Sequence, residues 1–255
     1  MKNMVILFCL TLMLTQASPS RKMNDRELEG FKGPVRKVFE EWSPQTEGSN
    51  VPIGDRCPRE TQQYDQRGRL TSLVLYPGIC GEDGEIRDDY SYDKDGNRLG
   101  RTDDSKASGI PISPPNQSIP SDRRNQDDSY STKHVLKHDS KGRISEESVY
   151  SPSGELIDKT VYKYDAQNRL IESDSVDPDG SISEKQTFIY NGNGRFPSGS
   201  ISRGSDGKPK EKETYSDYEV NSRGDWIRRR EIVEHLDQPN RPKTITIIIR
   251  TIDYY

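Results

Sequence analysis

The segment YKYDAQNRL at residues 162–170 decides the fold, because its pattern recurs along the chain. Two tyrosines stand two positions apart, and the second is followed directly by Asp165. Alternate residues of a β-strand share a face, so both tyrosines are expected on one side of a strand. Aspartate followed two or three residues later by glycine or asparagine is typical of a hairpin turn. We therefore predict a strand, a tight turn and a second strand over this segment.

Related segments lie on both sides of it. Asp139, Asp165 and Asn191 follow one another at intervals of 26 residues, so one unit holds two strands and two turns. Most copies carry glycine in the turn, and Asn168 stands there in the fourth copy because asparagine tolerates a positive φ. The other copies are QYDQRGRL (63–70), YSYDKDGNRL (90–99), LKHDSKGRI (136–144), FIYNGNGRF (188–196) and the degraded YEVNSRGDWI (218–227). A second, weaker turn lies between them at 81–86, 151–156, 177–182 and 204–209.

This pattern resembles the YD repeat of the RHS and teneurin class over most of residues 60–230. The resemblance implies a long antiparallel sheet of stacked hairpins, which curls into a shell around cargo in large members of the class. With about six copies and no evident C-terminal toxin domain, the chain is expected to be a short secreted member. We predict an all-β fold, an elongated antiparallel meander of hairpin repeats. Whether the sheet stays open or closes into a barrel or shell is not decided by the repeats.

The first residues are typical of a secretory signal peptide. The apolar run from Val5 to Leu14 is too short to span a bilayer, and small residues follow it at a cleavage position. We predict a signal peptide over 1–17, a linker over 18–30 and one β domain over 31–255 with a disordered insertion at 103–128. The mature chain is then secreted, to the extracellular space, the periplasm or the cell envelope, with no membrane span.

The flanks of the repeats are also expected to be strands. Residues 34–42 are rich in β-branched and aromatic residues and predict an opening strand, and residues 226–234 and 244–255 predict a closing hairpin. Removal of the signal peptide leaves two cysteines, Cys57 and Cys80. An even count in an oxidising compartment predicts one disulfide between them.

Composition limits the classes of function. Acids and bases are mixed, the formal net charge is −4, and no basic stripe indicates a nucleic-acid partner. The sequence motifs of P-loop, serine-hydrolase and zinc-protease enzymes are absent, which favours a protein that is not an enzyme and has no cofactor. His134 and His138 share a strand face but lack an evident third metal ligand. Calcium is the alternative at 93–97 and 177–180, where oxygen ligands alternate around a glycine as they also do in ordinary turns.

Carboxylates recur on the same strand face as the tyrosines. Asp88, Asp158 and Glu184 each follow an aliphatic residue by two positions. Tyrosine rings stack on sugars and carboxylates accept hydroxyl hydrogen bonds, so we predict a secreted or envelope-associated binding or scaffold protein that presents its sheet to a glycan or protein. The alternatives are a carbohydrate-active enzyme that uses Asp/Glu pairs and a relative of RHS toxin-delivery components. The predicted ligand-binding residues are Asp88, Tyr90, Tyr92, Asp158, Tyr162, Tyr164, Glu184 and Tyr190.

Overall fold

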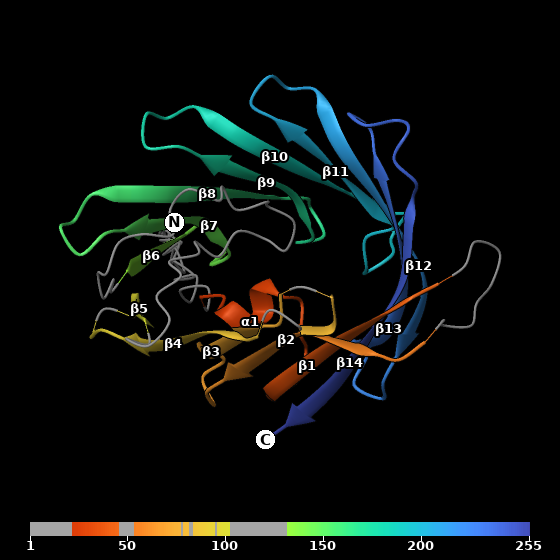
Figure 1. Cartoon of the computed structure of the whole chain (residues 1–255). Helices are drawn as coiled ribbons and strands as arrows, with labels where there is room; N and C mark the ends of the chain where they lie inside the picture. The colour runs from red at the N-terminus through yellow and green to blue at the C-terminus, as the bar shows by residue number, and fades with distance from the viewer. Residues whose placement is uncertain (1–21, 46–53, 78, 82–83, 95, 103–131) are drawn as a thin grey trace, which may run out of the picture.

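A computed structural model describes residues 22–45, 54–77, 79–81, 84–94, 96–102 and 132–255. Their strands form a single antiparallel sheet that closes on itself as a barrel (Figure 1). Each strand pairs with its neighbours in sequence, and the last strand pairs with the first. The strands are β1 Val35–Pro44, β2 Cys57–Tyr64, β3 Leu70–Leu75, β4 Ile86–Tyr92, β5 Arg98–Thr102, β6 Lys133–His138, β7 Ile144–Tyr150, β8 Leu156–Tyr164, β9 Leu170–Val176, β10 Ile182–Ile189, β11 Gly199–Gly204, β12 Pro209–Val220, β13 Trp226–His235 and β14 Thr244–Tyr254; the helices are α1 Asp25–Leu28 and the 3-10 turn η1 Ile79–Gly81.

The closed barrel corrects the expected elongated meander. β1 and β14 pair at nine positions, from Val35 with Tyr254 to Pro44 with Thr246, whereas an open sheet would leave both of these strands as free edges. Bulges give the physical reason. In β8 and β9, Lys163 pairs with Glu172 but Tyr164 pairs with Leu170, and the same shift occurs in β2–β3 and β6–β7. A bulge bends its strand and increases the local twist, so repeated bulges curl the sheet until its ends meet.

The turn chemistry of the repeat is confirmed. Asn168 has a φ of 64°, in the region that Gly142 occupies in the preceding copy with a φ of 79°. Asp165 closes the turn, because its carboxylate accepts hydrogen bonds from the Arg169 backbone N–H at 2.9 Å and from Arg169 Nε at 2.6 Å. Asp139 and Arg143 repeat both contacts one unit earlier. The turns that begin at Asp65, Asp139 and Asp165 are thus each fixed locally by one aspartate and one arginine.

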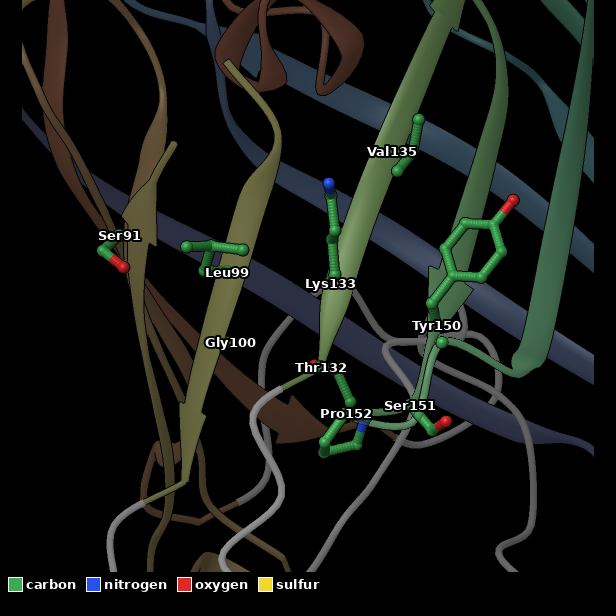
Figure 2. A pocket seen from close by; sticks show the side chains of 10 residues that line it. Ser91, Leu99, Gly100, Thr132, Lys133, Val135, Tyr150, Ser151 and Pro152 are labelled. Carbon is green, nitrogen blue, oxygen red and sulfur yellow. The ribbon is translucent and has the colours of Figure 1, made fainter. Parts of the chain in front are cut away.

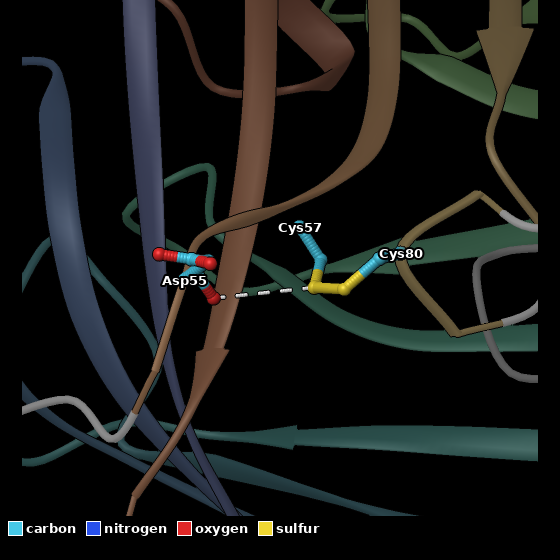
Figure 3. The surroundings of a disulfide bond; sticks show 3 residues. All are labelled: Asp55, Cys57 and Cys80. Atoms are coloured by element: carbon cyan, nitrogen blue, oxygen red, sulfur yellow. Dashed lines mark hydrogen bonds between the residues drawn. A yellow bond between two sulfur atoms is a disulfide. The ribbon is translucent and has the colours of Figure 1, made fainter.

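The flanking strands are confirmed as well. The opening strand is β1, and the closing hairpin is β13 and β14, which pair from Arg228 with Ile249 to Val233 with Thr244. Cys57 is bonded to Cys80, the pair expected from the cysteine count (Figure 3). The predicted signal peptide 1–17 and insertion 103–128 lie outside the described residues.

The two ends of the barrel differ in their connections. We call the end that holds the turns β2–β3, β4–β5, β6–β7, β8–β9, β10–β11 and β12–β13 the clamped end, and the other the opposite end. Residues 22–34 belong to the clamped end, because the Met23 N–H donates to the Gly142 carbonyl at 2.6 Å and the Arg26 N–H to the Gly68 carbonyl at 3.0 Å. The described part of the expected linker therefore holds α1, which lies within the outline of the barrel (Figure 1).

The apolar core lies at the clamped end, between this N-terminal segment and the wall. Its buried members are Phe31, Val35, Val38, Tyr64 and Leu70. Phe31 meets the Tyr64 ring edge to face at a centroid distance of 6.2 Å. The core is therefore a layer between α1 and the neighbouring strands, and the rest of the interior is lined mainly by polar and aromatic side chains.

Candidate functional site

Contacts of α1 identify which side of each strand faces the barrel interior. The Asp25 carboxylate accepts a hydrogen bond from the Tyr92 hydroxyl at 2.7 Å and lies 3.9 Å from Arg98 Nη1. Side chains alternate along a strand, so residues in register with Tyr92 and Arg98 at every second position form the inner wall. Asp88 and Tyr162 on this wall are half-buried, which shows that side chains do not fill the interior completely.

The structure places all eight predicted ligand-binding residues on the inner wall, on β4, β8 and β10 or, for Tyr190, directly after β10. Three of the tyrosine hydroxyls lie against a carbonyl of the preceding repeat at the clamped end. Tyr164 donates to Ile144 at 2.8 Å and Tyr190 to Leu170 at 2.9 Å, whereas the one proton of the Tyr92 hydroxyl is shared between the Leu70 carbonyl and the Asp25 carboxylate, each at 2.7 Å. These three hydroxyls therefore link neighbouring repeats. Ligand binding by the eight residues, Asp88, Tyr90, Tyr92, Asp158, Tyr162, Tyr164, Glu184 and Tyr190, stays a prediction.

The three carboxylates lie at corresponding places. Asp88, Asp158 and Glu184 are each the third residue of a strand that begins at the opposite end. Burial raises the pKa of Asp88 to about 6, with a further contribution from the neighbouring charge of Asp89. Burial also raises the pKa of Asp158. This part of the inner wall therefore favours a ligand that supplies hydroxyl groups or positive charge.

A buried ionic group, the Arg98 cluster, joins β5, β6 and β7 on the inner wall. It consists of Arg98, His134 and Glu147. His134 Nδ1 lies 2.8 Å from a Glu147 carboxylate oxygen and 3.1 Å from Arg98 Nη2, and Arg98 forms an ion pair with Glu147. Burial raises the pKa of Glu147, but the attraction of Arg98 and the His134 hydrogen bond outweigh it and bring the pKa to about 2.

The histidine pair does not converge on a metal. His134 belongs to the Arg98 cluster, and His138 Nε2 lies 3.0 Å from the Met23 carbonyl oxygen. Within the described ranges, no group of three or more His, Cys, Asp or Glu side chains is arranged to hold a metal ion. Asp95 of the candidate calcium turn lies outside those ranges, so the calcium alternative stays a prediction.

A second buried ionic group, the Arg250 cluster, lies on the inner wall of β13, β14, β1 and β2. Arg250 Nε donates to Glu40 at 2.8 Å, and Arg59 Nε approaches the other Glu40 oxygen at 3.3 Å. The Arg250 guanidinium lies 3.6 Å from the centre of the Trp226 ring. Burial, with repulsion from Glu40, raises the pKa of Glu60 to about 7.

Sequence reasoning missed the Arg250 cluster. Its charged members come from β14, β1 and β2, and β14 and β1 are neighbours only because the barrel closes. The one local signal is that Glu40 and Arg250 interrupt apolar alternation in two strands, where a charged residue on a buried face calls for a partner.

The outer wall carries cross-strand ion pairs. Lys137 Nζ lies 2.6 Å from Glu146, and Lys185 Nζ lies 3.0 Å from Glu172. Lys163 joins the second pair through an ion pair with Glu172. Charged ladders therefore cover the outer side of β6–β7 and β8–β10.

One cavity of about 700 Å³ lies on the outer side of β4 to β7. Figure 2 shows Leu99 on β5, Lys133 and Val135 on β6, and Tyr150 on β7 around it. The β5–β6 register holds two pairs, Arg98 with His134 and Leu99 with Lys133. The cavity thus marks the place where the wall is least tightly paired among the described strands, and it shares none of its lining with the eight predicted residues.

No helix in the part of the chain that the structure describes is long and apolar enough to cross a membrane. No protein-family model and no curated protein matches the chain. Solved structures that resemble it include a porin-like protein from Bacteroides uniformis, with 12% identity and a TM-score of 0.46, over 92% of this chain and 100% of that one. A porin-like protein from Bacteroides vulgatus has 11% identity and a TM-score of 0.38, over 88% and 99%. At TM-scores below 0.5, neither likeness assigns a function to this chain.

The predicted membership of the YD-repeat class is wrong. No family model of that class matches, and the hairpins close into a 14-strand barrel where the class would imply an elongated sheet. The alternative of a relative of RHS toxin-delivery components rested on this membership and loses its basis as well. What the repeats do specify is the hairpin unit with its Asp–Arg turn.

Proposed function

We propose that this protein is an envelope-associated, non-enzymatic binding protein whose barrel interior receives a glycan. The observation that carries the proposal is that Asp88, Asp158 and Glu184 occupy matching places on the inner wall, each the third residue of its strand, with Tyr90 and Tyr162 further along two of these strands. Carboxylates accept hydrogen bonds from sugar hydroxyls, and tyrosine combines an apolar ring with a polar tip. The half-buried state of these side chains is what a site open to a ligand requires.

The proposal includes a wall that faces water and does not span a bilayer. Lys137, Glu146, Lys163, Glu172 and Lys185 all project from the outer side of the strands. A lysine on the lipid side of a barrel costs about 2–4 kcal/mol at the bilayer midplane. A wall with several such charges is far better accommodated in water.

A matched pair of triple variants tests the binding site. The inner-wall variant is Asp88→Asn, Asp158→Asn, Glu184→Gln, and the outer-wall control is Asp89→Asn, Glu146→Gln, Glu172→Gln. After a glycan array has identified an oligosaccharide, calorimetry should show binding at least tenfold weaker for the inner-wall variant, since each lost hydrogen bond contributes about 1 kcal/mol. Equal affinity of the two variants, or a blank array with the native chain, would contradict the proposal.

The enzymatic alternative is tested with the same proteins. Asp88, whose pKa is raised to about 6, is the group that a glycosidase of this design would use as its acid. Release of reducing sugar by the native chain, lost in Asp88→Asn with binding retained, would favour an enzyme. Binding without turnover would favour the non-enzymatic function.

A further inference from the structure

The clamped end carries an excess of exposed positive charge. Its turn arginines, such as Arg69, Arg143 and Arg169, are each neutralised by the aspartate of their own turn. Six other exposed bases at this end form no ion pair with any described residue: Lys22, Lys32, Arg67, Lys94, Lys141 and Arg223. Against them stand the exposed Glu29 and Asp217 and the C-terminal carboxylate. The six bases come from four turns and from both sides of α1, so they are spread around the rim.

The opposite end has the reverse balance. Six exposed acids there form no ion pair within the described part of the chain: Asp55, Glu85, Glu155, Asp177, Asp179 and Asp237. Two exposed bases, Lys210 and Arg241, accompany them. Among the described residues, the exposed charges without an ion-pair partner are therefore asymmetric along the barrel axis, mainly positive at the clamped end and mainly negative at the opposite end.

Exposed apolar side chains accompany the positive rim. Tyr255 is 50% exposed, Val220 52% and Ile189 40%, and each lies at or next to the clamped end of its strand. Two other exposed large apolar residues, Ile182 and Leu236, lie toward the opposite end. Bases with apolar and tyrosine tips between them are the combination that binds the interfacial region of an anionic membrane.

We propose that the clamped end docks on an anionic lipid surface, with the opposite end directed away from it. Each base near such a surface strengthens binding roughly fivefold, and the ring of bases meets a plane without needing a groove. The acidic opposite end is repelled by the same surface, which fixes the orientation. This inference is independent of the glycan site, because none of its residues lies on the inner wall.

Vesicle co-sedimentation of the mature chain tests the docking. Phosphatidylcholine vesicles with and without phosphatidylglycerol are compared for the native chain, the clamped-end variant Arg67→Gln, Lys94→Gln, Lys141→Gln, and the opposite-end control Lys208→Gln, Lys210→Gln, Arg241→Gln. We expect salt-sensitive binding only with phosphatidylglycerol, weakened about 100-fold in the clamped-end variant and unchanged in the control. An unfolding midpoint equal to that of the native chain shows that the variant is folded.

Three results would overturn the proposal: no binding of the native chain to anionic vesicles, equal losses in the two variants, or displacement of the chain from vesicles by duplex DNA at lower concentration than by free lipid. The variant Val220→Ser, Tyr255→Ser separates apolar contact from charge. It should lower the fraction that stays bound at high salt and leave low-salt binding within about threefold. Resistance of native binding to both high salt and alkaline carbonate would instead indicate insertion of the wall.

Discussion

The two ends of the barrel are stabilised in different ways. At the clamped end, contacts run from one repeat to the next: Arg169 stacks on the Tyr190 ring at 4.3 Å, and the Tyr190 hydroxyl donates back to the Leu170 carbonyl. Arg69 with Tyr92 and Arg143 with Tyr164 repeat the stacking at 4.4 and 4.6 Å. At the opposite end, the described turns are closed by contacts within the turn, such as Ser181 with Asp179 and Lys208 with Asp206.

This difference predicts that the two ends of the barrel tolerate changes in turn length and sequence unequally. A turn linked to its neighbours by stacking and hydrogen bonds cannot change in length without breaking both. A turn that is closed only within itself can change freely. In agreement with this, the two widest separations in sequence between consecutive strands, from Pro44 to Cys57 and from Thr102 to Lys133, both join strand ends at the opposite end. Mutations at the clamped end should therefore cost more than matched mutations at the opposite end.

The largest effect is expected at Asp25, which links α1 to the clamped end. It is 8% exposed and accepts hydrogen bonds from the Leu70 N–H and the Tyr92 hydroxyl, beside the buried Arg98. Asp25→Ala leaves the Leu70 N–H without its acceptor and removes a negative charge beside the buried Arg98, while the Tyr92 hydroxyl keeps the Leu70 carbonyl as its acceptor. The variant should destabilise the fold by about 3–5 kcal/mol in urea unfolding. The control is Asp253→Ala, whose exposed partner Arg36 lies 3.6 Å away and which should stay within about 1 kcal/mol. Equal midpoints for the two variants would mean that α1 does not stabilise the barrel.

The second effect is a dependence on pH that differs along the barrel axis. Burial raises the pKa of Glu60 to about 7. Its protonated form is favoured by folding, so its contribution is fully present below the unfolded value near 4.5 and is lost as the pH rises through 7. Burial also raises the pKa of Asp165 at the clamped end, but hydrogen bonds from Arg169 outweigh it and lower the pKa overall. That contribution is lost as the pH falls below about 4.

Hydrogen exchange resolved by residue can separate these two regions. Raising the pH from 5 to 8 should weaken the native fold by on the order of 2 kcal/mol, and Glu60→Gln should remove most of this loss. Lowering the pH to 3 should lower the protection of backbone amides from exchange first in the β8–β9 turn. If Glu60→Gln shows the same alkaline loss as the native chain, the burial of that carboxyl does not control it.

The third effect compares one residue from each end. Arg169→Ala removes a stack on Tyr190, an ion pair with Asp165 and hydrogen bonds to the Gly192 and Gly194 carbonyls at 2.8 and 2.9 Å. We expect a loss of about 2 kcal/mol in unfolding free energy. Lys208→Ala removes one exposed ion pair at the opposite end and should change it by less than about 0.5 kcal/mol. Arg169→Lys should recover little, because an ammonium cannot form the planar fork.

The hairpins could be predicted from the sequence because their chemistry is local. Asp165, Asn168 and Arg169 lie within five residues, and each does what its type favours in a turn. The strand faces followed from the spacing of Tyr162 and Tyr164. The stacking of arginine on the next repeat's tyrosine has a signal in the repeats too, since both recur, but the pattern does not say which tyrosine lies under which arginine.

Closure of the sheet could not be predicted in the same way. It depends on the small bend added by each bulge and on pairing between residues about 200 positions apart, such as Glu40 with Arg250. The role of the expected linker was hidden for a related reason, since Asp25 acquires its partners Tyr92 and Arg98 only inside a closed barrel. The repeat predicts the hairpin unit, whereas the sum of many small bends decides whether the sheet stays open or closes into a barrel.

The smallest effect concerns the one turn that has asparagine where the other copies have glycine. Asn168 adopts a φ of 64°, and its side-chain oxygen accepts a hydrogen bond from Arg143 Nη1 at 3.1 Å. Asn168→Ala keeps the unfavourable backbone and loses this link between repeats, so it should cost about 1–2 kcal/mol. Asn168→Gly also loses the link but relieves the backbone, and should change stability by only a few tenths of a kcal/mol. If thermal unfolding shows equal losses for both, the contact between repeats outweighs the conformation of the turn, and the clamped end depends on its neighbours even more than its local chemistry indicates.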